Sequence, residues 1–403
     1  MSEQSQPSRS PLSWSSLSRS RLVPLALVLV PLALMLLAFV WIAALDPLRS
    51  FNNAAPPVEA LTVERSILDQ SGIQLLVRAG GSEPMVIAQV QVDDAFWSFA
   101  QDPAGPIARG KTAWINIPYP WVLGEAHLVN MLSNTGTAFE HEIAVALPTP
   151  KATPGQLRQQ AIVGAIVGLL PVALGLMFFP AMRGVGRSGM NFLLALTVGL
   201  LAFLLVDMTN EALELAAESA ALFQGSAMVW LAALASFLLL MAVGRWRGTP
   251  EGIALAFYIA LGIGLHNFGE GLAIGAAFAV GSAGLGTFLV LGFALHNVTE
   301  GIGIAAPMLR SRPPLWTFPA LTLLAGGPAI LGMWMGSLAF ALQWSALALA
   351  IGAGAILQVI VEVTAYLLRQ NPKPDNALFS PAVISGFLGG AGFMYVTAAI
   401  IKI

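Results

Sequence analysis

Two short polar stretches in otherwise apolar surroundings could do chemistry in this chain. One reads His-Asn-Phe-Gly-Glu-Gly over residues 266–271, and the other reads His-Asn-Val-Thr-Glu-Gly over residues 296–301. Each stretch lies near the centre of a segment that is apolar enough to cross a bilayer. An ionised side chain at the centre of a membrane helix costs about 2.5–3.5 kcal/mol on insertion scales, so such residues are usually functional. The repetition on consecutive segments therefore predicts a metal site inside a membrane.

The spacing within each stretch favours a shared set of ligands. Residues four apart lie on one face of a helix, so the histidine and the glutamate of each stretch point the same way. Imidazole nitrogens with carboxylate and amide oxygens suit divalent first-row ions such as zinc, iron(II), manganese or cobalt. Two carboxylates can also bridge a pair of ions, and a purely structural network of interhelical hydrogen bonds is the alternative. The candidate metal ligands are His266, Asn267, Glu270, His296, Asn297 and Glu300.

Other acidic residues interrupt two further apolar segments. Asp207 and Glu211 are four apart in one of them, and Glu214 and Glu218 continue towards its end. Glu362 lies in a later segment. Carboxylates spaced along a membrane path raise the local concentration of cations. We therefore interpret Asp207, Glu211 and Glu362 as a transport pathway on either side of the central site, with solvated or snorkelling acids as the alternative.

The composition identifies an integral membrane protein. Of 403 residues, 57% are hydrophobic and 10% are charged, and the mean hydropathy is +0.77. A soluble domain carries about a quarter charged residues. The absence of cysteine excludes disulfides and thiolate metal sites. No basic block indicates binding to nucleic acid.

The chain divides into four predicted regions. Residues 1–21 are rich in Ser and are expected to form a disordered tail. The apolar run 22–45 is expected to be a retained transmembrane anchor, because it is longer than the apolar region of a signal peptide. Residues 46–158 are expected to form an extracytoplasmic β-sandwich with linkers, and residues 159–403 a domain of eight membrane helices.

The pattern of each region predicts its elements. Short alternating runs bounded by turn residues are typical of an antiparallel sandwich, and apolar runs of about 20 residues are typical of membrane helices. Strands are expected at 73–79, 85–93, 112–121, 127–132 and 139–147. Helices are expected at 159–180, 190–213, 226–243, 251–279, 284–307, 315–341, 345–368 and 379–402.

Two histidines fall within the predicted sandwich, His127 and His141. His141 alternates in phase with apolar neighbours, so we expect a position in the sandwich core rather than a metal ligand. Glu140 and Glu142 then take the opposite, solvated face.

The distribution of basic residues predicts the orientation. Cytoplasmic loops carry an excess of Lys and Arg, which places the N-terminus in the cytoplasm and both the sandwich and the C-terminus outside a plasma membrane. Four inner loops follow this rule, with Arg183 and Arg187, Arg245 and Arg247, Arg310 and Arg312, and Arg369 and Lys373.

The paired motif resembles that of the ZIP (Zrt/Irt-like) family of divalent metal transporters, of prokaryotic type. The resemblance covers about residues 159–403 and is most specific at the two polar stretches. It implies an eight-helix core with both ends outside. It further implies that His266, Glu270 and Glu300 are ligands of a primary site, and that Asn267 and Asn297 adjoin it in a second site with the same glutamates.

The chain departs from the family pattern in three ways. Gly269 and Thr299 replace the prolines of the motif, so we expect the usual helix kinks to be weaker or made differently. Gly327-Pro328-Ala329 stands where the family commonly has a Pro-Glu pair, which favours a single-ion centre. The anchor and the sandwich are additions to the bare family core.

These observations predict a transporter that carries zinc, iron or manganese ions into the cytoplasm. The metal is then the substrate, and no enzyme activity or cofactor is expected. A metal sensor or adaptor with a vestigial transport core is one alternative. An intramembrane metal-dependent hydrolase is another, although the chain has no HExxH and only two membrane histidines. The sandwich could dock a partner, shape the outer entrance or support a homodimer, and these roles stay open.

Overall fold

The computed structural model describes residues 22–45, 58–149, 153–246, 248–279, 283–338, 342–371 and 377–401. The expected disordered tail, 1–21, lies outside these residues. The chain divides into two compact units, Met1–Pro57 and Val58–Ile403. The first contains helix α1, Leu22–Leu45, which has the bounds of the predicted anchor and continues through Pro31.

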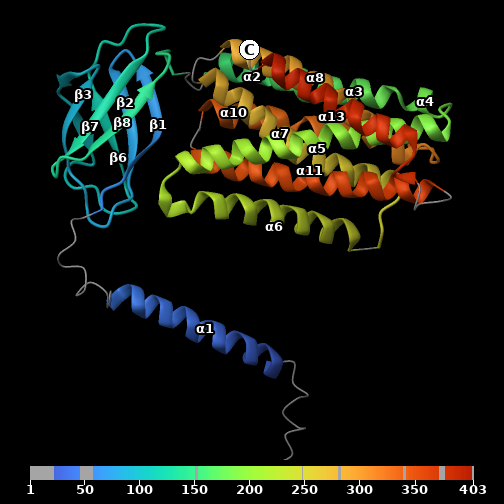
Figure 1. The fold of residues 1–403 in the computed structure, drawn as a ribbon, viewed down its shortest axis with the longest axis horizontal. Helices are drawn as coiled ribbons and strands as arrows, with labels where there is room; N and C mark the ends of the chain where they lie inside the picture. The colour runs from blue at the N-terminus through green and yellow to red at the C-terminus, as the bar shows by residue number, and fades with distance from the viewer. Residues whose placement is uncertain are drawn as a thin grey trace, which may run out of the picture. The chain divides into compact units, whose positions relative to one another are not determined.

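The second unit contains a bundle of helices (Figure 1). Seven of its helical segments, within the described residues, are long and apolar enough to cross a membrane. The prediction of a mostly helical protein with several apolar helices long enough to span a membrane and a small β region is therefore confirmed. The elements are α2 (Pro154–Gly164), η3 (Ala165–Leu169), α3 (Leu170–Met177), α4 (Phe179–Met182), α5 (Arg187–Glu218), η4 (Ala221–Phe223), α6 (Gly225–Arg245), α7 (Gly252–Ala279), α8 (Ala283–Ala305), η5 (Ala306–Met308), α9 (Thr317–Gly326), α10 (Pro328–Leu338), α11 (Leu342–Gln370) and α13 (Pro381–Ile401).

Two predicted helices contain irregularities that the apolar pattern does not reveal. The expected helix 159–180 includes a π-helical turn, η3, between α2 and α3. The expected helix 315–341 is two helices, because α9 ends at Gly326 and α10 begins at Pro328. Proline cannot donate a backbone hydrogen bond, so a helix commonly breaks before it.

The helices pack as two groups. Helix α5 packs against α6, α11 and α13, and α6 also packs against α11, whereas α2, α3, α7, α8, α9 and α10 form the second group. The packing of α7 against α11 joins the groups. Figure 1 shows α5, α7 and α11 lying alongside one another in the bundle.

Glycines bring the helices of the second group into close contact. A Cβ atom built on Gly332 of α10 would meet the carbonyl oxygen of Phe268 in α7, and one on Gly271 of α7 would meet that of Ala329 in α10. Small residues allow membrane helices to approach in this way. The α7–α10 contact fixes the helix that carries the first polar motif.

The β region consists of two four-stranded antiparallel sheets, with strand orders β1-β2-β6-β5 and β4-β3-β7-β8. Apolar residues from both sheets form one core, as in a sandwich. The strands are β1 (Leu61–Asp69), β2 (Gly72–Ala79), β3 (Ile87–Val92), β4 (Ala95–Trp97), β5 (Ala100–Asp102), β6 (Thr112–Ile117), β7 (His127–Ser133) and β8 (Ala138–Ile143).

The five predicted strands correspond to β2, β3, β6, β7 and β8. The short strands β4 and β5 and the longer strand β1 were not predicted. Charged Glu64 and Arg65 interrupt its alternation, and the structure explains their presence. Glu64 pairs with Arg78 at 2.5 Å and accepts a hydrogen bond from Gln343 of α11 at 3.2 Å. Arg65 donates to the carbonyl of Leu338 in α10 at 3.0 Å. These residues attach the sandwich to the bundle.

The histidines of the sandwich have structural partners. His141 is half-buried and its Nε2 lies 2.8 Å from Ser66 Oγ, whereas Glu140 and Glu142 are exposed, as predicted. Burial lowers the pKa of His141 below its ordinary value of 6.5. The buried His127 donates from Nδ1 to Asp93 Oδ2 at 2.7 Å.

The α7–α10 contact can be tested with one added methyl group. In Gly332→Ala the new Cβ meets a backbone carbonyl, so we expect a loss of about 1–3 kcal/mol of stability and a lower thermal unfolding midpoint in detergent. Gly389 of α13 has open space around it, so Gly389→Ala is the matched control and should be neutral or slightly stabilising. Equal midpoints for both variants would contradict the close packing.

The burial of His141 predicts a pH dependence of the sandwich. Because its pKa is lowered on folding, the unfolded state binds more protons below about pH 6.5, and stability falls as the pH drops. We expect hydrogen-exchange protection of β8, corrected for intrinsic exchange, to fall between about pH 7.5 and about pH 5.5. His141→Gln, which retains a polar partner for Ser66, should reduce this loss. An unchanged loss in the variant would show that other groups are responsible.

Candidate metal centre

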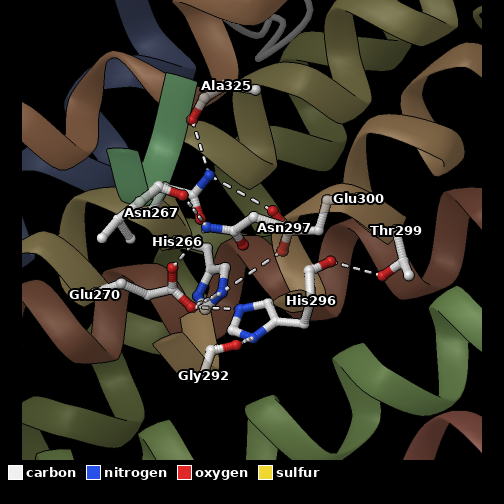
Figure 2. A network of polar contacts seen from close by, with 10 residues as sticks. His266, Asn267, Glu270, Gly292, His296, Asn297, Thr299, Glu300 and Ala325 are labelled. Atoms are coloured by element: carbon white, nitrogen blue, oxygen red, sulfur yellow. Dashed lines mark hydrogen bonds and ion pairs between the residues drawn. The ribbon is translucent and has the colours of Figure 1, made fainter. Parts of the chain in front are cut away.

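The two polar motifs lie on α7 and α8, which are continuous helices through both stretches. The predicted ligands, His266, Asn267, Glu270, His296, Asn297 and Glu300, are all buried, each with 2% or less of its surface exposed. Figure 2 shows that their side chains converge on one another from the two helices. The structure therefore brings together all six residues that the repeated motif predicts.

The histidines and glutamates contact one another across the two helices. Glu270 Oε1 lies 2.7 Å from His296 Nε2 and 3.1 Å from His266 Nε2. Glu300 Oε1 lies 3.7 Å from His266 Nε2. One donor atom from each of His266, His296 and Glu300 can be chosen so that all three lie within 4.8 Å of one another.

These separations are close to those in a metal site. Four ligands about 2.0–2.1 Å from a tetrahedral zinc ion lie about 3.3 Å from one another. The separations of 2.7, 3.1 and 3.7 Å bracket this value. The side chains therefore need only small movements to share an ion.

Both asparagines use their amide nitrogens on backbone carbonyls of neighbouring helices. Asn297 Nδ2 donates to Val167 O at 3.0 Å, and Asn267 Nδ2 donates to Ala325 O at 3.0 Å. Val167 belongs to the π-helical turn η3, and Ala325 to the last turn of α9. Wider turns and helix ends leave carbonyls without a partner in their own helix. The irregularities thus provide the acceptors that hold the asparagines.

The orientation of the asparagines leaves their oxygens available. Asn267 Oδ1 and Asn297 Oδ1 are buried and accept no hydrogen bond, and the same holds for Glu300 Oε1. His266 Nε2 is close to Glu270 but lacks the geometry of a hydrogen bond. Buried polar atoms without partners are rare and costly. A cation that accepts several lone pairs would satisfy this set together.

The tautomer of one histidine is fixed by the backbone. Gly292 O lies 3.1 Å from His296 Nδ1, and because a carbonyl can only accept, Nδ1 carries a proton. This arrangement turns Nε2 towards Glu270. Metal-binding histidines commonly donate their other ring nitrogen in this way.

With both glutamates ionised and both imidazoles neutral, the cluster carries a net negative charge. Helices α7 and α8 carry no Lys or Arg within their described bounds, and the two glutamates lie opposite two imidazoles. In a medium of low dielectric such a pair of carboxylates needs compensating charge. Protons on the histidines or a divalent ion can supply it.

Gly269 and Thr299, which stand where motifs of the ZIP type have prolines, make local contacts. Thr299 Oγ1 donates to His296 O at 2.6 Å. A Cβ on Gly269 would lie 3.1 Å from Met208 Cε of α5. Small residues at these positions keep α7 and α8 continuous and allow α5 to approach.

The three predicted pathway acids lie on other helices. Asp207 and Glu211 are exposed on α5, on either side of the buried Met208. Glu362 of α11 is fully buried and pairs with Arg245 of α6, with Oε1 2.9 Å from Nη2. These three acids therefore lie outside the cluster on α7 and α8.

Two residues near Glu362 did not enter the sequence argument as site residues. Arg245 was considered only for the orientation. Gln358 is fully buried, and neither atom of its side-chain amide has a hydrogen-bond partner. It lies one turn before Glu362, and its amide would meet a Cβ built on Gly262. Its position four residues from Glu362 in an apolar helix is the signal that could have identified it.

Comparison of the chain with models of known protein families and with curated proteins gives no match.

The role of the asparagines can be tested by metal binding. We expect Asn297→Ala to weaken zinc binding by about 10- to 100-fold, as removal of an oxygen ligand or its support usually does. Competition with a chromophoric chelator measures the affinity. Asn191 of α5 lies outside the cluster and is hydrogen-bonded to Asn371. The control variant Asn191→Ala should therefore bind zinc with the affinity of the parent protein. An unchanged affinity in Asn297→Ala would exclude this residue from the centre.

Proposed function

We propose that the chain is a membrane transporter of a divalent first-row metal ion, similar to the ZIP family, with the α7–α8 cluster as its central binding site. The observation that supports this is the set of buried acceptors without partners, Asn267 Oδ1, Asn297 Oδ1 and Glu300 Oε1, beside two imidazoles. A structural network of hydrogen bonds would be expected to satisfy these atoms itself.

The ligand types narrow the substrate. Nitrogen and oxygen donors without thiolate favour zinc, iron(II) or manganese over softer ions. Binding takes the Nε2 lone pair of His296, so it displaces the proton that this atom shares with Glu270. Ala329 stands where the ZIP family commonly has the glutamate of a Pro-Glu pair, and its methyl side chain cannot bind a metal, which is in keeping with a single ion.

The division of the bundle into two groups suggests how an ion could pass. The cluster lies on α7 and α8, in the group that also contains α2, α3, α9 and α10, and α7 borders the other group through α11. Rocking of one group against the other would expose the site to each side in turn. We further propose that uptake is directed into the cytoplasm, with Asp207 and Glu211 on the outer side and Glu362 on the inner side. Arg245 would then have to leave Glu362 before an ion could bind there.

Uptake of metal into proteoliposomes tests this function. We expect His266→Ala and Glu300→Ala to reduce the initial rate of zinc, iron(II) or manganese uptake by at least about tenfold, because each removes a ligand. Asn191→Ala, outside the cluster, should retain the parental rate.

The elution profile and the unfolding midpoint of each variant must match those of the parent protein, so that loss of folding is separated from loss of transport. Equal uptake in all variants would exclude the cluster as the transport site. Metal binding without uptake in the parent would favour a sensor or adaptor instead.

A further inference from the structure

A long apolar groove, here called the α3–α9 groove, opens on the surface of the bundle. It has a volume of about 1220 Å3 and is lined by residues of α2, η3, α3, α4 and α9. Its walls include Ile166, Leu170, Met177, Phe318 and Leu323. These side chains suit the hydrocarbon part of a ligand rather than a polar one.

One end of the groove is positively charged. Arg183 follows α4, Arg312 precedes α9, and both line the groove. Arg183 donates to Ser311 O at 2.6 Å and lies over the ring of Phe179 at 4.9 Å, which holds its guanidinium in place. Within the described residues no carboxylate pairs with either arginine. The two positive charges therefore lack a carboxylate counter-charge from the part of the chain that the structure describes.

The dimensions of the groove match a lipid of one leaflet. Ile162 and Met177 both line it, and fifteen residues of helix rise about 22 Å. This is more than half of the roughly 30 Å hydrocarbon core of a bilayer. The arginines lie at the end of the helices, where head groups are expected, and the apolar walls run from there towards the middle of the bundle.

We propose that the α3–α9 groove binds an anionic glycerophospholipid, with its phosphate at Arg183 and Arg312 and an acyl chain along α3. Basic pockets between membrane helices bind anionic head groups in this way. A zwitterionic lipid, or an apolar helix of a second copy, would fill the groove but leave the two charges uncompensated. This inference does not depend on metal transport.

The groove shares a wall with the metal centre. Ala165, Ile166 and Leu169 of η3 face the groove, whereas the carbonyl of Val167 in the same turn accepts from Asn297. A lipid in the groove therefore packs against the π-helical turn that orients one asparagine of the cluster.

Native mass spectrometry of the full chain in detergent, without metal, tests the proposal. The probes are dioleoyl phosphatidylglycerol and dioleoyl phosphatidylcholine at equal concentrations. We expect preferential binding of phosphatidylglycerol, weakened by about tenfold or more in Arg183→Gln/Arg312→Gln. Arg187→Gln/Arg369→Gln removes the same charge from exposed arginines outside the groove and should leave binding unchanged.

A second variant tests the apolar part of the groove. Ala173 lines it, so Ala173→Phe should weaken binding of phosphatidylglycerol without a change of charge. Equal binding of the two lipids by the parent, or parental binding in Arg183→Gln/Arg312→Gln, would overturn the proposal. The proposal would also be overturned if the parent protein formed a lipid-free dimer and Ala173→Phe dissociated it. That result would assign the groove to a second copy of the chain.

Discussion

The interior of a membrane offers no water to satisfy buried lone pairs, and the α7–α8 cluster holds more acceptors than its own donors can satisfy. Two carboxylates and two amide oxygens lie beside two imidazoles in a site with almost no exposed surface. Unpaired polar groups cost several kcal/mol each in such a medium. A single divalent cation could accept several of these lone pairs and also balance the negative charge of the two glutamates.

The irregular backbone of the neighbouring helices helps to orient the two asparagine side chains of the cluster. The amide nitrogens of Asn297 and Asn267 donate to carbonyls of η3 and of the last turn of α9 and also to Glu270 and Glu300 of the cluster, while their buried amide oxygens keep no partner. Motifs of the ZIP type place prolines within the metal-binding helices themselves. Here α7 and α8 are continuous, and the irregularities lie on the helices packed against them. π-turns and proline breaks at such places are often tied to function.

Much of the fold could be predicted from the sequence because its signals are local. The anchor helix, most bundle helices and five strands follow from apolar runs and alternation. The charged residues of β1 hid that strand, since Glu64 and Arg65 are used for contact with the bundle rather than for solvation. The break at Gly327 and the π-turn were missed because an apolar run continues through both.

The six ligands of the candidate site were predicted because the same pattern occurs twice with helical spacing. Their backbone partners, Val167 and Ala325, could not be predicted, because a carbonyl has no signal in the sequence. The pairing of Glu362 with Arg245 joins residues far apart in the chain, and hydropathy alone does not distinguish such a pair from a pathway acid.

X-ray absorption spectroscopy of the zinc-loaded protein tests the central claim most directly, because it reports the atoms around the ion. The account expects a shell of nitrogen and oxygen at about 2.0–2.1 Å, with outer scattering from two imidazoles that falls to one in His296→Ala. A protein that retains no zinc, or a zinc shell without imidazole scattering, would contradict it.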